Sequence, residues 1–453
     1  MKFSTEFMQQ IGQLFVAELE AQLEGQEEVR IAQLEATLRE MLRQVGARCV
    51  GEYLTAQESR YPAATVACAC GGKAEYVCRR QAKILSVFGW VSYRRAYYIC
   101  SRCHTGQCPL DQRLGLKPGQ VSAGLADLLG IAGIQTSFGE ASQLVKRFLL
   151  IEVSENTIRK ESQMFGQLQA QREADWIVAS QDPETLQQRL RRAQDRPERL
   201  YGSIDGAHVP LKEEWQELKN GCWYQVEVIP EHQVPAHRRH KVGEMGALRA
   251  KDKAYYCDLK KAARFGELLW ATGCQRGADL AKEIVFVADA AAWIWKLVEH
   301  YFPNAVQIVD WYHAESYLEP IAKEAFAHDP EARQAWLQRV RTELWEGQVD
   351  KVIATCTHWV DHPQAGEFAK NAITYYTNNQ HRMDYARFRQ EGYMIGSGTV
   401  ESGCKQIVTQ RLKRSGARWT PNGAVETSKA RAVWLSGQWD ELSALRGQLP
   451  LAA

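Results

Sequence analysis

The sequence of 453 residues has no apolar run long enough to span a membrane, and its start lacks the apolar core of a signal peptide. These absences predict a cytoplasmic protein without membrane contact. The sequence also lacks internal repeats, low-complexity tracts and a large surplus of one charge, since the formal net charge is +2. Any basic surface for a polyanion must therefore be local. With 45% hydrophobic and 24% charged residues the composition is globular, and the length predicts two to four domains.

The cysteines are unevenly distributed, because six of the 12 lie between residues 68 and 108. In a chain without a secretion signal, such clustering indicates metal binding more than disulfides. A C-x-C pair, Cys68 and Cys70, precedes a C-x-x-C pair, Cys100 and Cys103. Four thiolates suit tetrahedral Zn²⁺, so residues 60–118 are predicted to form a zinc-ribbon-like segment with a structural ion. The C-x-C spacing departs from the usual gap of two and leaves three substitute ligands open. They are Cys78, His104 and Cys108.

Residues 1–58 are predicted to be helical, because apolar residues recur at steps of three and four. They are Ile31, Leu34, Leu38, Met41 and Val45. This face either packs on the chain itself or mediates self-association.

Residues 119–175 have the outline of a helix-turn-helix, with a second helix that begins after Ser154, a good N-cap. An ordinary helical hairpin would give the same pattern. If the segment binds DNA, the second helix presents four polar residues to a groove. They are Asn156, Thr157, Arg159 and Lys160. The charged residues 176–199 are expected to form a linker or a surface helix.

From residue 200 the pattern changes to short runs of apolar and β-branched residues. The runs are 200–211, 221–229, 254–259, 283–289 and 305–310, and a helical pattern over 290–302 separates the last two. Strands followed by an alternation of strand and helix predict an α/β domain, a mixed sheet covered by helices. Residues 314–390 are expected to be a helical insertion.

Three carboxylates stand out in this half of the chain. Asp205 precedes Gly206 at a strand end, Asp289 precedes three alanines at another, and Glu401 follows a loop rich in glycine and serine. Small neighbours would leave room for a ligand, although a lone strand-end aspartate often caps the next turn. If the strands are neighbours and the helix of Glu401 crosses them, the three acids meet. Divalent cations would then relieve their repulsion, and two Mg²⁺ ions can promote attack on a phosphate.

The segment after Glu401 is predicted to be a helix with several cations and no acid. They are Lys405, Arg411, Lys413, Arg414 and Arg418. Such a helix either grips the phosphates of DNA or is a solvated charged face. Trp419 either stacks on an unpaired base or lies in the core.

The order of "SIDG", "VADAAAWIW", "VDWYHAESYL" and "GSGTVESGCK" resembles the DDE transposases of bacterial insertion sequences, in particular the Kra-type family on the mutator-like branch. The resemblance covers most of residues 60–440. It implies a ribonuclease-H-like catalytic domain over residues 200–440 with the helical insertion at about 314–390. It also implies that Asp205, Asp289 and Glu401 are the catalytic acids and bind two Mg²⁺ or Mn²⁺ ions.

Asp310 and His313 match the Asp-x-x-His mark of that branch, and Asp310 is the rival of Asp289 as the second acid. His313 contacts DNA or the reacting phosphate, or it makes a structural contact with Asp310. His208 is expected to be structural.

By this resemblance the protein would bind the terminal inverted repeats of its element. It would then nick the element ends and join the freed 3′-hydroxyls to target DNA. The resemblance also implies that the protein acts on DNA of the nucleoid as a homo-oligomer. Two other classes stay open: a DNA-binding regulator without catalysis, and a metal-dependent nuclease of the same fold.

Overall fold

The computed structural model describes residues 5–24, 30–58, 62–192, 196–233 and 247–448. Short parts of the predicted N-terminal helical region, cysteine-rich segment, linker and catalytic domain therefore lie outside the described residues. The chain divides into two compact units, one formed by residues 1–168 and 440–453 and the other by residues 169–439. The boundary between them falls within a single long helix.

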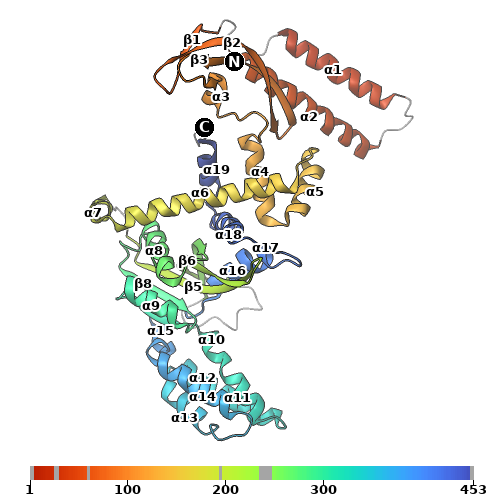
Figure 1. Ribbon diagram of the computed structural model, residues 1–453. Coiled ribbons are helices and arrows are strands. Elements are labelled where there is room, and N and C mark those ends of the chain that lie inside the picture. The colour runs from red at the N-terminus through yellow and green to blue at the C-terminus, as the bar shows by residue number, and fades with distance from the viewer. Residues whose placement is uncertain (1–4, 25–29, 59–61, 193–195, 234–246, 449–453) are drawn as a thin grey trace. The chain divides into compact units, whose positions relative to one another are not determined.

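The first unit contains a four-stranded antiparallel sheet in the order β1-β2-β3-β4, accompanied by helices (Figure 1). Its strands are β1 (Thr65–Ala67), β2 (Lys73–Ser86), β3 (Gly89–Cys100) and β4 (Gly106–Gln107). Its helices are α1 (Thr5–Leu23), α2 (Ile31–Ala56), α3 (Pro109–Leu114), α4 (Ala123–Gln135), α5 (Phe138–Leu149), the first half of α6 (Glu155–Gln181) and nearly all of α19 (Trp439–Gln448). The predicted N-terminal helical region is thus present as α1 and α2.

Helices α5 and α6 begin at capping residues that the sequence displays. The Ser137 hydroxyl accepts the Glu140 N–H (3.2 Å) and the Glu140 carboxylate accepts the Ser137 N–H (3.1 Å), a reciprocal cap at the start of α5. After α5, Leu150 takes the left-handed conformation with φ of 57° and ends the helix. The Ser154 hydroxyl accepts the Thr157 N–H (3.2 Å), so α6 begins where the sequence predicts. One apolar core joins α4, α5 and the start of α6 to β2: Leu85, Leu125, Leu129, Ala141, Val145, Ile151, Val153 and Ile158.

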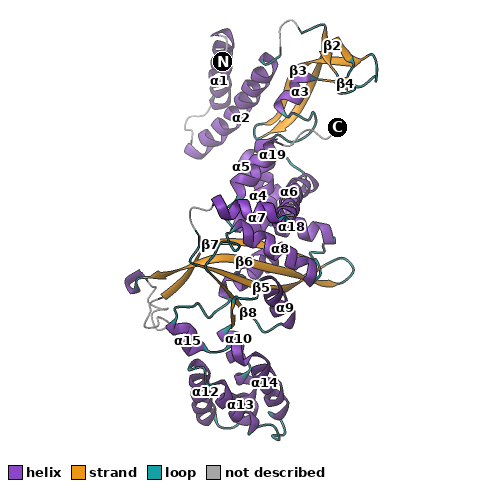
Figure 2. Cartoon of the chain, turned by 90° about the vertical axis from the view of Figure 1, so that its left-hand side faces the viewer, coloured by secondary structure: helices purple, strands orange, loops and turns teal. Residues whose placement is uncertain are grey.

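The second unit is built on a five-stranded mixed sheet in the order β7-β6-β5-β8-β9. The strands are β5 (Arg199–Pro210), β6 (Trp215–Ile229), β7 (Ala247–Asp258), β8 (Glu283–Ala288) and β9 (Val306–Val309). Strands β5, β6 and β7 pair antiparallel, whereas β8 pairs in parallel with both β5 and β9. Helix α8 (Ala262–Gln275) packs against β6 and α18 (Pro421–Leu435) against β7, so the predicted α/β class is confirmed (Figure 2).

Aromatic side chains fill the core under this sheet. The Trp223 ring meets the rings of Phe286 and Phe302 edge to face, with centroids 5.4 Å apart in both pairs. Gly202 pairs with Phe286 across β5 and β8, and a Cβ at this position would lie 2.5 Å from the Phe286 ring. Glycine is therefore required in β5 because an aromatic ring occupies the place of its side chain.

The remaining elements of the second unit are mostly helical. They are α7 (Pro183–Arg192), the short η1 (Glu231–Gln233), α9 (Ala292–Tyr301), α10 (Trp311–Ser316), α11 (Leu318–Ala325), α12 (Pro330–Trp345), α13 (Val349–Thr357), α14 (Gly366–Asn379), η3 (Gln380–Arg382), α15 (Tyr385–Gln390), α16 (Gly398–Cys404), the π-helical η4 (Lys405–Thr409) and α17 (Gln410–Leu412). Elements α10 to α15 form the predicted helical insertion between β9 and Glu401. No helix among the described residues is long and apolar enough to cross a membrane.

The interpretation of residues 176–199 as a linker is wrong, whereas a helix fits. Residues 176–181 continue α6, and α7 follows almost at once. The Asp182 carboxylate accepts the Thr185 N–H (3.0 Å) at the start of α7, and Arg189 pairs with Asp279 (3.0 Å). The Ser180 carbonyl accepts the Trp270 indole N–H (3.1 Å). These bonds hold the segment against α8 and the residues after it within the second unit, and Arg189 is the cation that pairs there.

A buried ion group connects α6, β7 and α18 within the second unit. The Lys429 ammonium contacts Glu173, lies 3.1 Å from an Asp258 oxygen and donates to the Cys257 carbonyl (2.8 Å). All three charged side chains are almost fully buried. Burial lowers the pKa of Lys429, but the two carboxylates outweigh it and hold the pKa above the ordinary value. The lysine therefore stays charged and neutralises part of a buried negative pair.

Replacing Lys429 by methionine is expected to destabilise the second unit by about 3–5 kcal/mol, because two buried carboxylates would lose their cation. Urea unfolding followed by tryptophan fluorescence measures the change. Lys260→Met is the matched control, because Lys260 faces the same Asp258 at 3.5 Å but is about half exposed. We expect the control to cost less than about 1 kcal/mol. Equal effects of the two variants would contradict the role given to Lys429.

Candidate functional site

Asp205 lies within β5, opposite Asn220 of β6, and is half-buried. One of its carboxylate oxygens accepts the N–H of Gly206 (2.7 Å). Burial raises the pKa of Asp205 and the charges of Asp289 and Glu401 raise it further, while bonds from the Cys404 thiol and the Gly206 N–H oppose this rise. The strand thus places a carboxylate where water is scarce and two other acids act on it.

Asp289 directly follows β8, the parallel neighbour of β5. Its Oδ1 accepts the N–H of Ala291 (3.0 Å), just before α9 begins at Ala292. The charge of Asp289 also raises the pKa of Tyr317 and Tyr375, although burial is the larger cause for both. Asp289 therefore caps a turn, as one of the two interpretations expected, and its charge also acts on Asp205.

Glu401 lies in the first turn of α16 and is held by a relay of hydrogen bonds that begins at Asp310. Asp310 follows β9, is 1% exposed and accepts the backbone N–H groups of His313 (2.6 Å) and Ser397. The Ser397 hydroxyl in turn donates to Oε1 of Glu401 (2.8 Å). Asp310 is thus a positioning residue that fixes the loop before Glu401, and both its oxygens already accept backbone N–H groups.

The three predicted acids lie on neighbouring elements, because β8 is the parallel neighbour of β5 and α16 packs against β5. Among the described residues they do not form a group close enough to share an ion as the four cysteines do, so their role as a metal site stays a prediction. Asp205, Asp289 and Glu401 lie on β5, after β8 and on α16, and the charges of the second and third reach the first. In each of the three a hydrogen bond fixes one carboxylate oxygen. Carboxylate oxygens are the kind of ligand that Mg²⁺ and Mn²⁺ prefer, whereas zinc favours sulfur and nitrogen.

Replacing Asp205 by asparagine is expected to stabilise the metal-free protein by about 1 kcal/mol, a usual gain when a functional group under electrostatic strain is removed. The raised pKa means that the folded state favours protonated Asp205, so its charged form costs stability above that pKa. The gain should shrink as the pH falls through the pKa. Thermal melting in EDTA measures it, and Asp361→Asn on the exposed surface should change little. A destabilised Asp205→Asn protein would contradict this assignment.

The room expected beside Asp205 is partly occupied. A Cβ on Gly206 would lie 2.2 Å from the Glu217 carboxylate, so the space that glycine leaves is taken by this side chain. Glu217 pairs with Lys219 (2.8 Å). His208 is exposed and lies opposite Glu217 in the ladder, away from the three acids along β5.

His313 and two tyrosines lie near the acids. The His313 ring is exposed and lies 6.0 Å from the Tyr317 ring and 6.3 Å from the Tyr375 ring, centroid to centroid. Tyr317 and Tyr375 stack at 3.9 Å. Tyr375 belongs to α14 and is 8% exposed. The insertion therefore contributes two stacked tyrosines, Tyr317 and Tyr375, near Asp289. The sequence pattern does not reveal this pair.

The predicted basic helix after Glu401 is shorter than expected. It ends at Leu412, and Lys413, Arg414 and Arg418 lie in the following loop. This loop contains Gly416 with φ of 73° and is fixed to β5, because the Trp419 N–H donates to the Pro210 carbonyl (3.1 Å).

The roles predicted for the cations in this segment differ. Arg411 is 2% exposed with its guanidinium 4.9 Å from the centre of the Trp419 ring, so its assignment to a DNA-facing surface is wrong. Lys405, Lys413 and Arg418 are exposed. Trp419 is 7% exposed and its indole N–H donates to the Leu412 carbonyl (3.0 Å), so it is a core residue.

The four residues predicted to face DNA from α6 lie in its first two turns. Asn156, Arg159 and Lys160 are exposed, and Thr157 is half-buried. The Arg159 guanidinium donates to the side chains of Asn156 (2.6 Å) and Gln163 (2.9 Å). The helix therefore presents a polar surface whose arginine is held in place by its neighbours.

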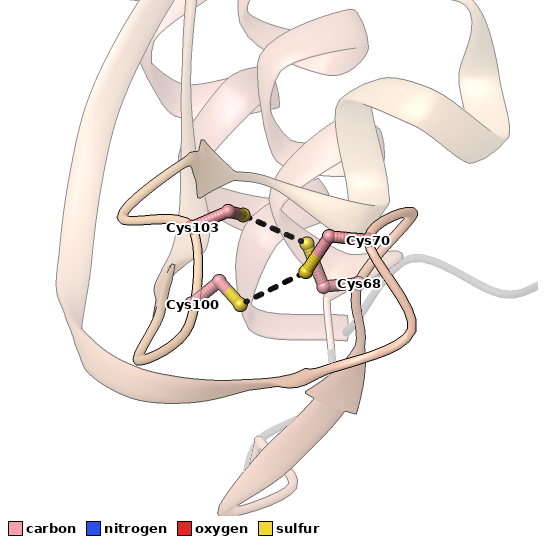
Figure 3. Close-up of side chains that lie close together, drawn as sticks. All are labelled: Cys68, Cys70, Cys100 and Cys103. Atoms are coloured by element: carbon pink, nitrogen blue, oxygen red, sulfur yellow. Dashed lines mark hydrogen bonds between the residues drawn. The ribbon is translucent and has the colours of Figure 1, made fainter.

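The four predicted cysteine ligands gather at one end of the first unit's sheet (Figure 3). The sulfurs of Cys68 and Cys103 are 3.6 Å apart, as are those of Cys70 and Cys100, and all four lie within 4.8 Å of one another. Tetrahedral zinc with bonds of about 2.3 Å requires sulfurs about 3.8 Å apart, so the geometry suits one ion. Cys78, His104 and Cys108 are described but lie outside this group, so the C-x-C pair supplies both of its cysteines.

Two tight turns hold the cysteines. The Cys68 N–H donates to the Gly72 carbonyl (3.0 Å), and Gly71 takes a φ of 79°. In the second turn the N–H of His104, whose φ is 58°, donates to the Cys100 carbonyl (2.9 Å). Bonds from Thr105 lower the pKa of Cys103 to about 6, so this thiol is ready to bind a cation at neutral pH.

The chain matches the uncharacterised protein family UPF0236 over residues 25–443. It belongs to this family. A comparison with curated proteins gives no match. The UPF0236 match includes the four cysteines and the three acids, so both candidate sites lie within the region that defines the family.

Several residues near the three acids of this UPF0236 protein could not be recognised from the sequence. Ser397 and Cys404 flank Glu401 in "GSGTVESGCK", but only the fold shows that one bonds Glu401 and the other Asp205. Tyr317 and Tyr375 come from the insertion, 58 residues apart (375 − 317 = 58). Their distance along the chain hides their stacking.

Proposed function

We propose that the chain is a DDE transposase of an insertion sequence, which cleaves DNA at the ends of its element and joins the 3′-hydroxyls to target DNA. The observation that supports the proposal is that Asp205, Asp289 and Glu401, which lie 84 and 112 residues apart in the sequence, stand on neighbouring elements, with the charges of Asp289 and Glu401 acting on Asp205. Asp205 and Asp289 are half-buried and Glu401 is exposed, and neighbouring acids that repel each other cost stability, so their placement favours a function that needs them. When bound, two Mg²⁺ or Mn²⁺ ions would supply a polarised water or hydroxyl and stabilise the leaving oxygen.

The architecture of the second unit supports a ribonuclease-H-like interpretation. Three antiparallel strands are followed by two parallel ones, and a helical insertion precedes the helix with the final glutamate. This is the arrangement implied by the resemblance to DDE transposases. The residues of the chain have defined tasks in the proposal: the three acids hold the ions, Asp310 and Ser397 orient Glu401, and exposed Lys405, Lys413 and Arg418 attract phosphates.

The first unit would then recognise DNA. Helix α6 and its capped start support a helix-turn-helix, and the four cysteines support a structural Zn²⁺ that holds the small sheet together. In this proposal the protein acts as a homo-oligomer on the nucleoid, and its DNA ligand is the terminal inverted repeat of the element.

A strand-joining assay tests the proposal. The purified full chain is mixed with Mg²⁺, a supercoiled target plasmid and duplex DNA from the flanks of its coding sequence, cut so that a 3′-hydroxyl is free. A transposase joins this end to the plasmid, whereas a nuclease of the same fold cuts without joining and a regulator only binds. The absence of joined product under conditions that support binding would contradict the proposal.

A further inference from the structure

The middle of the β2–β3 hairpin is a two-stranded ribbon. Among the described residues, β1 pairs only with residues 73–75 of β2, and β4 pairs only with residues 98–99 of β3. Strands β2 and β3 pair with each other from Ala74 to Ser86, with one irregularity between Tyr76 and Cys78. The ribbon therefore extends well beyond the short outer strands, as Figure 2 shows.

One face of this ribbon is packed and the other is open. Ala82, Ile84, Val91 and Tyr93 are buried, and their cluster includes Leu54 of α2 and Leu110 of α3. Side chains alternate along a strand, so the residues between them point the other way. Over residues 79–83 of β2 and 90–94 of β3, helices thus support one side of the ribbon while the side chains of the second side are exposed. Beyond this stretch the second side is covered, because Leu85 packs in the core with α4 and α5 and Ala96 is buried.

The open face carries a specific set of polar side chains. Gln81 lies opposite Arg94 and Lys83 lies opposite Ser92, while Arg79 precedes Gln81 on the same side of β2. All five are exposed. We call them the ribbon face. Arg79 and Lys83 are four residues apart, so the ribbon face extends about 13 Å along the strand.

The charge of the ribbon face differs from that of the packed side. No acidic residue occupies the alternating exposed positions 79–83 of β2 or 90–94 of β3 on this face. The acid that lines a pocket with Trp90 and Ser92 is Glu52 of α2. On the packed side, by contrast, the cation of Arg95 is neutralised by the buried Asp111. At the hairpin end, the Lys83 ammonium lies 4.8 Å from the centre of the half-exposed Trp90 ring. The open side therefore suits a polyanion.

The kinds of side chain suit DNA bases as well as phosphates. The major groove of duplex DNA admits a two-stranded β-ribbon, and its base edges are read by arginine or lysine at guanine and by glutamine at adenine. The ribbon face offers arginine, glutamine and lysine together, with Gln81 and Arg94 side by side. Helices α2 and α3 pack on the other face of the ribbon and support its backbone.

We propose that the ribbon face enters the major groove of duplex DNA and reads bases through Gln81 and Arg94. This inference rests on the proposed function, because it takes the DNA next to the coding sequence as the specific ligand. It assigns sequence recognition to the four-stranded sheet that carries the cysteine group, in addition to α6. Arg79 and Lys83 contact the phosphates on either side of the groove.

Fluorescence anisotropy of the full chain tests the assignment, with two labelled duplexes as probes. One is the DNA that flanks the coding sequence and the other is a scrambled duplex of the same composition. Arg94→Ala and Gln81→Ala are each expected to weaken binding to the flanking duplex about 10- to 100-fold, with a much smaller effect on the scrambled one. Arg94→Lys should retain binding to scrambled DNA and lose discrimination, because lysine lacks the two-pronged donor.

Arg80→Ala is the matched control, because Arg80 is exposed on the same strand but stacks on Tyr97 on the opposite side, 3.4 Å from the ring centre. It should leave discrimination unchanged. Bound zinc is measured for every variant, so that a misfolded sheet is recognised.

Equal losses on both duplexes would reduce the ribbon face to phosphate contacts and overturn base reading. Unchanged binding by Arg94→Ala and Gln81→Ala would overturn the inference altogether. Either result leaves the proposed function intact if the wild-type chain still joins DNA in Mg²⁺. A wild-type chain that binds the flanking duplex selectively but never joins it would contradict the proposed function and not the inference.

Discussion

Replacing Glu401 by glutamine is expected to reduce Mg²⁺-dependent strand cleavage by at least about 10³-fold, while binding to duplex DNA stays the same. The amide keeps the shape of the side chain and can still accept the Ser397 hydroxyl, but it removes a charge from the ion site. Losing several kcal/mol of charge stabilisation in the transition state corresponds to this factor. Cleavage of an end-labelled flanking duplex on a denaturing gel measures the rate, and anisotropy measures the affinity.

Glu331→Gln is the matched control, because Glu331, like Glu401, is exposed in the first turn of a helix, but it lies in the insertion. It should cleave at the wild-type rate. A Glu401→Gln enzyme that still cuts would end the assignment of Glu401 to catalysis.

Asp289 and Asp310 are expected to respond differently to the same change. Asp289→Asn should abolish cleavage with little effect on folding, because the side chain is only half-buried and caps a single turn. Asp310→Asn should lower stability by about 1–3 kcal/mol, because an amide cannot accept two buried backbone N–H groups at once. Thermal melting and the cleavage assay separate the two outcomes. If Asp310→Asn folds normally and loses cleavage, Asp310 and not Asp289 is the second acid.

Loss of one cysteine ligand is expected to disorder the cysteine end of the first unit's sheet. Binding of structural zinc supplies about 10–16 kcal/mol in small zinc-binding peptides, as much as a whole domain has in stability. In Cys103→Ser, amide hydrogens near Cys68 and Cys100 should exchange as fast as in an unfolded chain. Those near Ile84 and Val91 should stay protected by their contacts with α2. Hydrogen exchange with mass spectrometry and metal analysis measure both effects.

Cys78→Ser is the matched control for this experiment. Cys78 belongs to the same sheet but lies outside the group of four sulfurs. The control should keep one zinc per chain and the wild-type exchange pattern. Full zinc content in Cys103→Ser would show that the four sulfurs do not form the site.

Local chemistry in the sequence predicted much of this fold. Ser154 marked the start of α6 correctly because its hydroxyl caps the first turn, a contact within three residues. The strands ending at Asp289 and Asp310 were equally clear, because they are short apolar runs followed by a polar residue. The four cysteines were found despite the irregular C-x-C gap, since no other residue type binds zinc so readily.

Features that depend on distant contacts escaped the sequence. The charged residues 176–199 resemble a linker until Arg189 meets Asp279, 90 residues later. Arg411 has the composition of a DNA contact, but the fold buries it against Trp419. Ser397 and Asp310 lie 87 residues apart and are in contact because the two ends of the insertion lie side by side. Nothing in the local pattern encodes such meetings.

The closure of the insertion has a consequence for how this fold can vary. Its two ends are tied together, because the Trp311 N–H donates to the Ile395 carbonyl (3.0 Å) and the Ser397 N–H to Asp310. The length of the insertion between these two ends therefore does not determine the position of Glu401. Evolution could therefore shorten, enlarge or replace the insertion, provided that the two hydrogen bonds between its ends are kept.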